Sequence, residues 1–327
     1  MIFVGLKEYA IKRAIETIAT FFILVIIGFF LFRVMPGDPT AILILNPHIS
    51  PETRLLLRKQ LGIDQPLYIQ FFYFIKNFFM GEFGYSFHNG RPVVELIFGY
   101  RLFNTLVLVG TSVVLAIIIG VIMGAIAALR RGSKVDLGML TASLAFYSMP
   151  VFWLAMILLM LFSVYMRIFP LGGTISAKVH ESILDYIADY LNHMVLPLIA
   201  LTLIQIGYNF LIVRNTLIDI LTEDYIVAVR AKGLPERTVL FKHALRNAML
   251  PLTTIVALQL ASIFTGAVLT ETVFSWEGLG RLLYEAVDER DYPVLQGLFA
   301  LIVVAFLVAN YVADIVYAFL DPRVRYR

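Results

Sequence analysis

The chain has 327 residues, of which 60% are hydrophobic and only 15% are charged, and its mean hydropathy is +0.85. Soluble proteins carry about 25% charged residues, so this composition excludes an ordinary soluble domain and predicts a chain that crosses the membrane several times. The net charge of +3 comes from basic residues scattered between apolar runs, which excludes a nucleic-acid-binding tract.

Six stretches free of Asp, Glu, Lys and Arg are long enough to cross the membrane. About 20 helical residues cover the hydrocarbon core of roughly 30 Å. The first stretch, 17–32, extends to 14–34 if Glu16 and Arg33 lie at the membrane rims. The others are 102–129, 137–166, 194–213, 247–270 and 294–313. The sequence therefore predicts an all-α membrane protein with six transmembrane helices, the third kinked at Pro150.

Residues 35–101, between the first two spans, are too many for a simple connection and predict an external helical insertion. Ser50 and Pro51 favour the start of one helix, which Gly62 ends. A second helix begins at Pro66 and ends near Gly81. Its aromatic side chains suit either the membrane interface or a docking surface for an external partner; they are Tyr68, Phe71, Phe72, Tyr73, Phe74, Phe78 and Phe79.

Basic residues are concentrated in alternate segments, which predicts the orientation of the chain. The N-terminal segment, residues 130–136, residues 214–246 and the tail after Asp314 hold 3, 3, 6 and 3 Lys or Arg residues. The intervening segments 167–193 and 271–293 hold two each. The long loop after the first span also carries basic residues, but long loops cross the membrane despite their charge. Both termini are therefore predicted to be cytoplasmic in a multi-pass protein of the cell membrane.

Three regions follow from this pattern. Residues 1–34 hold the N-terminal segment and first transmembrane helix, which reads as a retained helix because no small-residue cleavage site follows it. Residues 35–101 form the external loop. Residues 102–327 form a five-helix core with a cytoplasmic loop at 214–246.

Several kinds of chemistry are missing from the sequence. The spans carry no Asp, Glu, Lys or Arg away from their rims, which argues against an ion-coupled carrier, although backbone carbonyls alone can hold sodium. No phosphate-binding G-x-x-x-x-G-K-[ST] loop is present, so any nucleotide that drives transport is bound by another subunit. Neither H-E-x-x-H nor G-x-S-x-G occurs, the five histidines are scattered over loops, and cysteine is absent. No catalytic residue, metal site or cofactor is predicted in this chain.

The cytoplasmic loop contains a short helix with clear end signals. Thr222 is the predicted N-cap, and Gly233 supplies the left-handed position after the last turn. Pro235 then opens a second helix toward Leu245. A helix this short is not stable alone, and apolar side chains such as Val227 stand clear of any span. These features favour a protein-docking role over a solvated loop.

The residues of this loop also match a known pattern, with Asp224-Tyr225, then Arg230-Ala231-Lys232-Gly233-Leu234-Pro235-Glu236-Arg237, then His243-Ala244-Leu245-Arg246-Asn247-Ala248. Further blocks along nearly the whole chain include Met35-Pro36-Gly37-Asp38-Pro39, Glu271-Thr272-Val273-Phe274-Ser275-Trp276 and Leu320-Asp321-Pro322-Arg323. The chain thus resembles ABC importer permeases of the dipeptide/oligopeptide/nickel family, specifically the B-type transmembrane subunit. It has Val227 where the general ABC importer pattern has Glu, a departure that agrees with the peptide branch.

The resemblance implies a non-catalytic permease subunit that forms half of the passage for oligopeptides or similar-sized solutes. Oligosaccharides, or nickel, are the alternative cargoes within the same architecture, and an ion-coupled carrier acting alone is the alternative from another class. The implied partners are a second homologous permease, two ATP-binding subunits that hold ATP and Mg, an extracellular solute-binding protein and membrane lipid, with no nucleic acid. The residues implied to couple to the ATPase are Tyr225, Ala228, Val229, Arg230, Ala231, Lys232, Gly233 and Leu234.

Polar residues within the spans are candidates for lining the passage. The five predicted are Gln205, Asn209, Gln259, Ser262 and Thr265. Hydrogen bonding between neighbouring helices is the structural alternative for all of them. Gly120 and Gly124, one turn apart, predict close approach between the second span and another helix.

Overall fold

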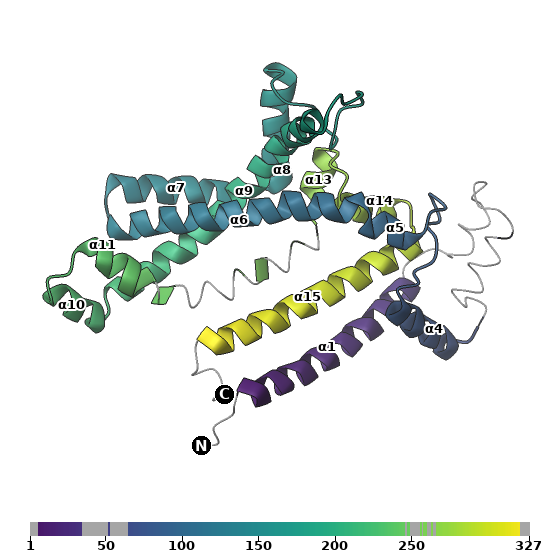
Figure 1. Cartoon of the computed structure of the whole chain (residues 1–327), viewed down its shortest axis with the longest axis horizontal. Coiled ribbons are helices and arrows are strands. Elements are labelled where there is room, and N and C mark those ends of the chain that lie inside the picture. Colours follow the sequence, from purple (N-terminus) through teal and green to yellow (C-terminus); the bar gives the residue numbers. More distant parts are fainter. Residues whose placement is uncertain are drawn as a thin grey trace.

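The computed structural model describes residues 6–34, 52, 65–245, 247–248, 256, 258–259, 263 and 266–320. Within these ranges every regular element is a helix, which confirms the all-α prediction there (Figure 1). The elements are α1 (Leu6–Val34), α4 (Leu67–Met80), α5 (Val93–Phe98), α6 (Tyr100–Leu129), α7 (Lys134–Ser148), α8 (Val151–Leu158), the π-helix η1 (Leu159–Tyr165), α9 (Ile183–Leu221), α10 (Asp224–Ala231), α11 (Glu236–Thr238), the π-helix η2 (Val239–Ala244), α13 (Val268–Val273), α14 (Leu279–Asp288) and α15 (Tyr292–Leu320).

Several helical stretches in the described ranges are long and apolar enough to cross a membrane. Four of them, Lys7–Phe32, Val93–Leu129, Ile183–Leu221 and Tyr292–Val316, contain the predicted first, second, fourth and sixth spans. A fifth crossing results if the bent pair of Lys134–Ser148 and Val151–Tyr165 counts as one span. The remaining predicted span, 247–270, lies mostly outside the described residues. The structure thus confirms a helical protein with several spans, and the number six stays a prediction.

The predicted kink at Pro150 is a complete break. α7 ends at Ser148, Pro150 becomes the N-cap of α8, and the two halves are bent by 100°. Proline lacks the amide hydrogen that would continue the helical ladder. Leu154 and Ala155 of α8 pack in one cluster with Leu196 of α9, and these contacts hold the second half in its new direction. The predicted kink at Pro150 is confirmed, and the structure shows that it is a bend of 100°.

α6 and α9 form the central helix pair, running alongside each other for most of the length of α6 (Figure 1). Two glycines of α6 make the contact close. A Cβ atom added at Gly120 would lie 2.6 Å from Cβ of Asn209, and one at Gly124 would lie 2.8 Å from Cβ of Val213. Any larger side chain would push the helices apart, so the prediction of close helix approach is confirmed.

α1 and α15 form a second pair of long helices (Figure 1). Gly28 lies directly against the ring of Phe299, and the ring centroids of Phe32 and Phe299 are 5.6 Å apart. At the other end of the pair, Nε of Arg13 lies 3.5 Å from a carboxylate oxygen of Asp314. Aromatic packing and an ion pair therefore hold the two helices together at opposite ends.

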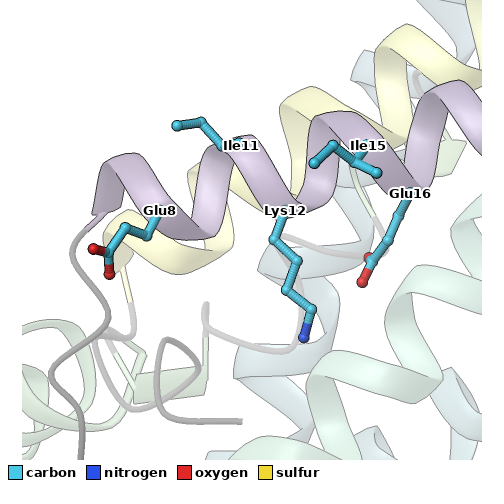
Figure 2. Close-up of a pocket in the computed structure, with 5 residues that line it drawn as sticks. All are labelled: Glu8, Ile11, Lys12, Ile15 and Glu16. Atoms are coloured by element: carbon cyan, nitrogen blue, oxygen red, sulfur yellow. The ribbon is translucent and has the colours of Figure 1, made fainter.

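The first helix begins well before the predicted span, because its charged residues continue the helix instead of ending it. α1 starts at Leu6. Along one exposed face of its first turns, Glu8, Lys12 and Glu16 alternate with Ile11 and Ile15 and form a shallow hollow (Figure 2). Charged and apolar side chains at helical spacing suit a helix end that emerges from the hydrocarbon core.

Several of the shorter elements lie at two opposite ends of the molecule (Figure 1). α10, α11 and the turn between α6 and α7 lie at one end, and α4, α5 and α14 lie at the other. Which of the two ends faces the cytoplasm stays a prediction. The predicted second helix of the outer loop is confirmed as α4, with Gly81 at its C-cap in the left-handed conformation (φ +68°). The first predicted helix of that loop lies outside the described residues, apart from Glu52.

Candidate coupling site and passage residues

The short helix predicted in the cytoplasmic loop is present as α10. It follows α9 after the two residues Thr222 and Glu223. Thr222 is not its N-cap, because the Thr222 hydroxyl donates a hydrogen bond back to the carbonyl oxygen of Asp219 at 2.7 Å. Thr222 instead ends α9, and Glu223 is the N-cap of α10. The prediction was wrong by one residue because α9 runs further than the charge pattern suggests.

Ile226 is the main apolar anchor of α10. It has no exposed surface and belongs to a buried cluster with Val213 and Leu217 of α9, against which Val229 also packs. The same buried cluster also contains Ala125, Ala128, Val239, Leu240, Ala244 and Ala248. The Tyr225 hydroxyl accepts a hydrogen bond from the Asn247 side chain at 2.6 Å, so one side of α10 is fixed to the helices around it.

The opposite side of α10 is exposed. Tyr225, Val227 and Leu234 remain 40%, 56% and 38% exposed. The neighbouring Ala228, Arg230, Ala231, Lys232 and Gly233 are exposed as well, and Val229 is half-buried. Seven of the eight predicted coupling residues thus lie on an accessible surface that mixes apolar and basic side chains.

The chain leaves α10 through a turn that requires glycine. Gly233 has φ of +76° and donates its amide hydrogen to the carbonyl oxygen of Arg230 at 2.9 Å. A Cβ atom there would meet nothing within 4 Å, so the backbone angle alone selects glycine. Arg230 then bridges the turn, with two nitrogens 2.8 and 3.2 Å from the carboxylate oxygens of Glu236. The predicted second helix follows as α11 and η2.

A buried ion pair supports α9 at the same end of the molecule. Two guanidinium nitrogens of Arg214 in α9 lie 2.6 and 2.8 Å from the carboxylate oxygens of Asp136 in α7. The side chains are only 14% and 5% exposed. The amide of Gly132 donates to the same carboxylate at 2.9 Å, and the Ser133 hydroxyl caps α7 by accepting from the Asp136 amide. Charge-assisted bidentate contacts of this kind are the strong ones, so the turn between α6 and α7 is locked to α9.

The predicted passage residues in the described ranges lie between helices. The Gln205 side chain donates to the Ser112 hydroxyl at 3.2 Å, and the Gln259 side chain donates to Oδ1 of the Asn209 side chain at 2.9 Å. Asn209 is almost completely buried. These contacts are compatible with the helix-packing alternative, and a role in the passage stays a prediction. Ser262 and Thr265 lie outside the described residues.

At the opposite end, a buried carboxylate that the sequence analysis did not single out organises α13 and α14. Glu271 has no exposed surface. It accepts a hydrogen bond from the Thr105 hydroxyl at 2.9 Å and one from the Arg281 amide at 3.0 Å. The Thr105 hydroxyl in turn accepts from the Leu279 amide at 2.7 Å. Burial raises the pKa of Glu271, while the hydrogen bonds from Arg281 and Thr105 oppose that rise.

Glu271 and Thr105 thereby cap α14 from outside that helix. The N-cap position is Gly278, which has no side chain to satisfy the first amides of α14. A Cβ atom at Gly278 would lie 2.4 Å from a Glu271 carboxylate oxygen and 2.5 Å from the Thr105 hydroxyl. Glycine is required there so that the two caps can approach the backbone.

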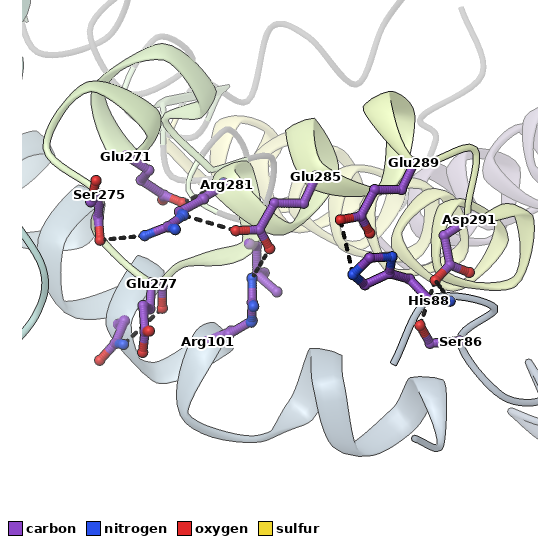
Figure 3. A network of polar contacts seen from close by, with 12 residues as sticks. Ser86, His88, Arg101, Glu271, Ser275, Glu277, Arg281, Glu285, Glu289 and Asp291 are labelled. Atoms are coloured by element: carbon purple, nitrogen blue, oxygen red, sulfur yellow. Dashed lines mark hydrogen bonds and ion pairs between the residues drawn. The ribbon is translucent and has the colours of Figure 1, made fainter. Parts of the chain in front are cut away.

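Ion pairs extend this network along the exposed side of α14 (Figure 3). Glu285 accepts from both Arg281 and Arg101, at 2.8 and 2.9 Å, so it joins α14 to α6. Nε2 of His88 lies 3.3 Å from Glu289, and the buried Asp291 accepts from the Ser86 hydroxyl. The loop between α4 and α5 is therefore tied to α14. Among the described residues, no three His, Asp or Glu side chains are placed to hold a metal ion.

The fold and these sites define a helical membrane protein with several spans, in which the short helix α10 packs on the other helices with one side and is exposed on the other. The family described as "Binding-protein-dependent transport system inner membrane component" matches residues 120–326. The family described as "Binding-prot-dependent transport system membrane comp, N-term" matches residues 6–109. The chain belongs to the family of inner membrane components of binding-protein-dependent transport systems.

Curated relatives align along nearly the whole chain. The oligopeptide transport system permease protein AppB of Bacillus subtilis (strain 168) is 37% identical over 322 residues, covering 98% of this chain and 100% of that protein. The glutathione transport system permease protein GsiC of Escherichia coli (strain K12) is 39% identical over 320 residues, covering 98% and 99%. The di/tripeptide transport system permease protein DppB of Pseudomonas aeruginosa (strain UCBPP-PA14) is 37% identical over 335 residues, with the same coverage.

A solved structure shares the fold at lower sequence identity. It is an inward-facing conformation of the MetNI methionine ABC transporter, with a TM-score of 0.51 and 17% sequence identity. The match covers 68% of this chain and 95% of that chain. This likeness supports the arrangement of the membrane helices and nothing about the solute.

Proposed function

We propose that this permease forms half of the passage of an ATP-driven ABC importer. α10 is the coupling helix, and its bare side fits a groove of an ATP-binding subunit. The observation that carries the proposal is the division of α10 into two sides, with Ile226 completely buried and Val227 56% exposed. A helix that is fixed to the fold on one side and exposed on the other passes the movement of a bound partner to the helices beneath it.

The partners and the orientation follow from the same assignment. A second homologous permease completes the passage, two ATP-binding subunits hold ATP and Mg, and an extracellular solute-binding protein delivers the solute. This chain has no catalytic role. Both termini and α10 face the cytoplasm, because the segments on that side carry the excess of basic residues.

Peptides are the proposed solutes. The relatives are named for oligopeptides, di- and tripeptides and glutathione, and each aligns over nearly its full length. Oligosaccharides or nickel are the alternative cargoes. The absence of charged side chains in most of the predicted spans favours a neutral or zwitterionic solute over a metal ion.

Isolation of the complex tests the proposed partners. The chain is tagged in its native host and purified in mild detergent, and mass spectrometry identifies stoichiometric partners. Wild type is expected to retain a second permease and the ATP-binding subunits. Val227→Asp is expected to lose the ATP-binding subunits and keep the second permease. Val179→Asp, at a position that is 91% exposed in the loop before α9, is the control and keeps both. Purification of the chain alone, still active without ATP, would refute the assignment.

We also propose that Asn209 and Gln259 line the passage. Replacing either by leucine is expected to reduce solute uptake several-fold. Interhelical hydrogen bonds contribute about 0.6 kcal/mol on average, so loss of packing alone would change stability slightly and leave transport intact. Asn310→Leu is the control, because the half-buried Asn310 side chain donates to the carbonyl of Phe306 in its own helix and not to a neighbouring helix among the described residues. Unchanged uptake in both variants would assign Asn209 and Gln259 to helix packing.

A further inference from the structure

Both sides of α4 are rich in apolar side chains, but among the described residues only one side is packed against other helices. On the covered side, the ring of Phe71 lies 5.1 Å from that of Phe29 in α1, and Phe74 lies 5.7 Å from Phe29. Further along, the ring of Phe78 lies 5.3 Å from that of Phe21. Phe74 also packs against the buried cluster formed by α5, α14 and α15. α4 is thus held to the membrane helices by a row of aromatic rings.

The contacts with α1 define how deep α4 lies. Phe21 and Phe29 are eight residues apart, or about 12 Å along a helix. Both belong to the charge-free run 17–32 of α1, a helix long and apolar enough to span the membrane. Phe71 contacts Phe29, which is closer to Val34, and Phe78 contacts Phe21, which is nearer the middle of α1. α4 therefore runs from the Val34 end of α1 toward its middle, beside the part of α1 that is apolar enough to cross the hydrocarbon.

The uncovered side of α4 is made mainly of large apolar side chains, with the exposed Lys76 among them. Tyr68, Phe72, Phe79 and Met80 are 74%, 66%, 65% and 59% exposed. Only Gln70, Lys76 and Asn77 among its 14 residues are polar. Gly81 then ends the helix, and Phe83 contacts Phe78 as the chain turns back toward α5. A water-facing helix at a protein surface would carry a polar stripe, which this side of α4 lacks.

We propose that α4 is embedded in one leaflet of the bilayer and that its uncovered side contacts lipid acyl chains. Under the orientation proposed above, this is the outer leaflet. Acyl chains fit because they need no hydrogen-bond partners and match the side chains in polarity. Tyr68 lies at the start of α4, near the headgroup level where tyrosine is favoured. Lys76 is exposed, and its long stem lets the ammonium group reach toward the headgroups. The proposal does not depend on the solute or on ATP.

The chain contains no cysteine, so single thiols can be introduced without removing any native one. Phe72→Cys and Phe79→Cys report on the uncovered side of α4, and Val179→Cys is the control in an external loop. The ring of Phe79 also lies 5.6 Å from that of Phe21, so Phe79→Cys removes one contact with α1, while the contacts of Phe71, Phe74 and Phe78 with α1 remain. Phe72→Cys reports on the same side at the other end of the exposed row. Each variant is isolated as the assembled complex, reconstituted in phosphatidylethanolamine/phosphatidylglycerol vesicles, and spin-labelled at the thiol. The collision rates of the label with oxygen, which enters lipid, and with a water-soluble nickel chelate are then compared.

Labels at positions 72 and 79 are expected to collide with oxygen and to be protected from the nickel chelate, while the label at 179 shows the reverse. A membrane-impermeant maleimide reacts with the thiolate form of cysteine. A hydrocarbon environment raises the thiol pKa, and each pKa unit lowers the thiolate fraction, and so the labelling rate, about tenfold. We therefore expect labelling at 72 and 79 to be slower than at 179 by at least that factor. Rates at 72 and 79 equal to that at 179 would place α4 in water. Protection of both positions from oxygen as well would show that protein covers this side. Either outcome overturns the proposal.

Discussion

Replacing Gly233 by proline is expected to abolish solute uptake while the chain still inserts into the membrane. Proline fixes φ near −65° and has no amide hydrogen, whereas Gly233 has φ of +76° and donates to Arg230. Backbone strain of this kind costs on the order of 1–3 kcal/mol, and α10 is a helix of only eight residues with Ile226 as its one fully buried side chain. The exit from α10 changes direction, and ATP hydrolysis continues without transport. The measurement is the ratio of solute taken up to ATP hydrolysed in vesicles.

Gly81→Pro is the matched control for this backbone change. Gly81 also ends a helix with positive φ (+68°), its amide also donates to the carbonyl three residues earlier, and a Cβ there also meets nothing. It lies at the opposite end of the molecule, so the ratio of uptake to ATP hydrolysis is expected to stay normal. Normal uptake by Gly233→Pro would contradict the assignment of α10 as the coupling helix.

Replacing Arg214 by leucine is expected to cause the largest loss of stability. The substitution leaves the Asp136 carboxylate buried with the Gly132 amide and without its cation. Breaking a buried ion pair in this way costs about 3–5 kcal/mol. Thermal unfolding of the purified complex measures the loss. Because Arg214 and Asp136 lock the inner turn to α9, coupling is expected to weaken together with stability.

Two further variants separate the buried charge from the loss of side-chain volume. Arg230→Leu removes a similarly bidentate pair with Glu236, but its side chains are 40% and 59% exposed, so the expected loss is about 0–1 kcal/mol. The double variant Asp136→Leu with Arg214→Leu is expected to regain most of the stability, because an apolar pair of similar volume leaves no charge unpaired. Equal losses for Arg214→Leu and Arg230→Leu would mean that the inner pair contributes no more than a surface contact.

Local signals in the sequence predicted the elements whose ends depend on one or two residues. Charge-free runs located four of the spans, and Pro66 and Gly81 located α4 to within a residue. Gly233 correctly marked the end of α10, since a left-handed backbone angle is a local requirement. Close packing at Gly120 and Gly124 was predictable because two glycines one turn apart leave one face of α6 without side chains.

Features that depend on distant residues could not be predicted in this way. Proline at position 150 predicts a lost hydrogen bond, but the 100° bend depends on how α8 packs against α9. Glu271 reads as one more acid in an outer segment, because its partner Thr105 is 166 residues away. Arg214 and Asp136, 78 residues apart, read as separate contributions to the positive-inside pattern. The proposed coupling residues could be named from the sequence because they are contiguous, and their exposure agrees with that proposal.

Uptake into sealed vesicles tests most directly whether this permease works within an ATP-driven importer. The complex is reconstituted with its solute-binding protein and a radiolabelled peptide outside and ATP with Mg inside. We predict uptake that requires ATP, stops with vanadate and is lost in Val227→Asp. An imposed proton or sodium gradient without ATP is predicted to drive none. Uptake driven by the ion gradient alone, and unaffected by Val227→Asp, would contradict the coupling role of α10 and identify an ion-coupled carrier.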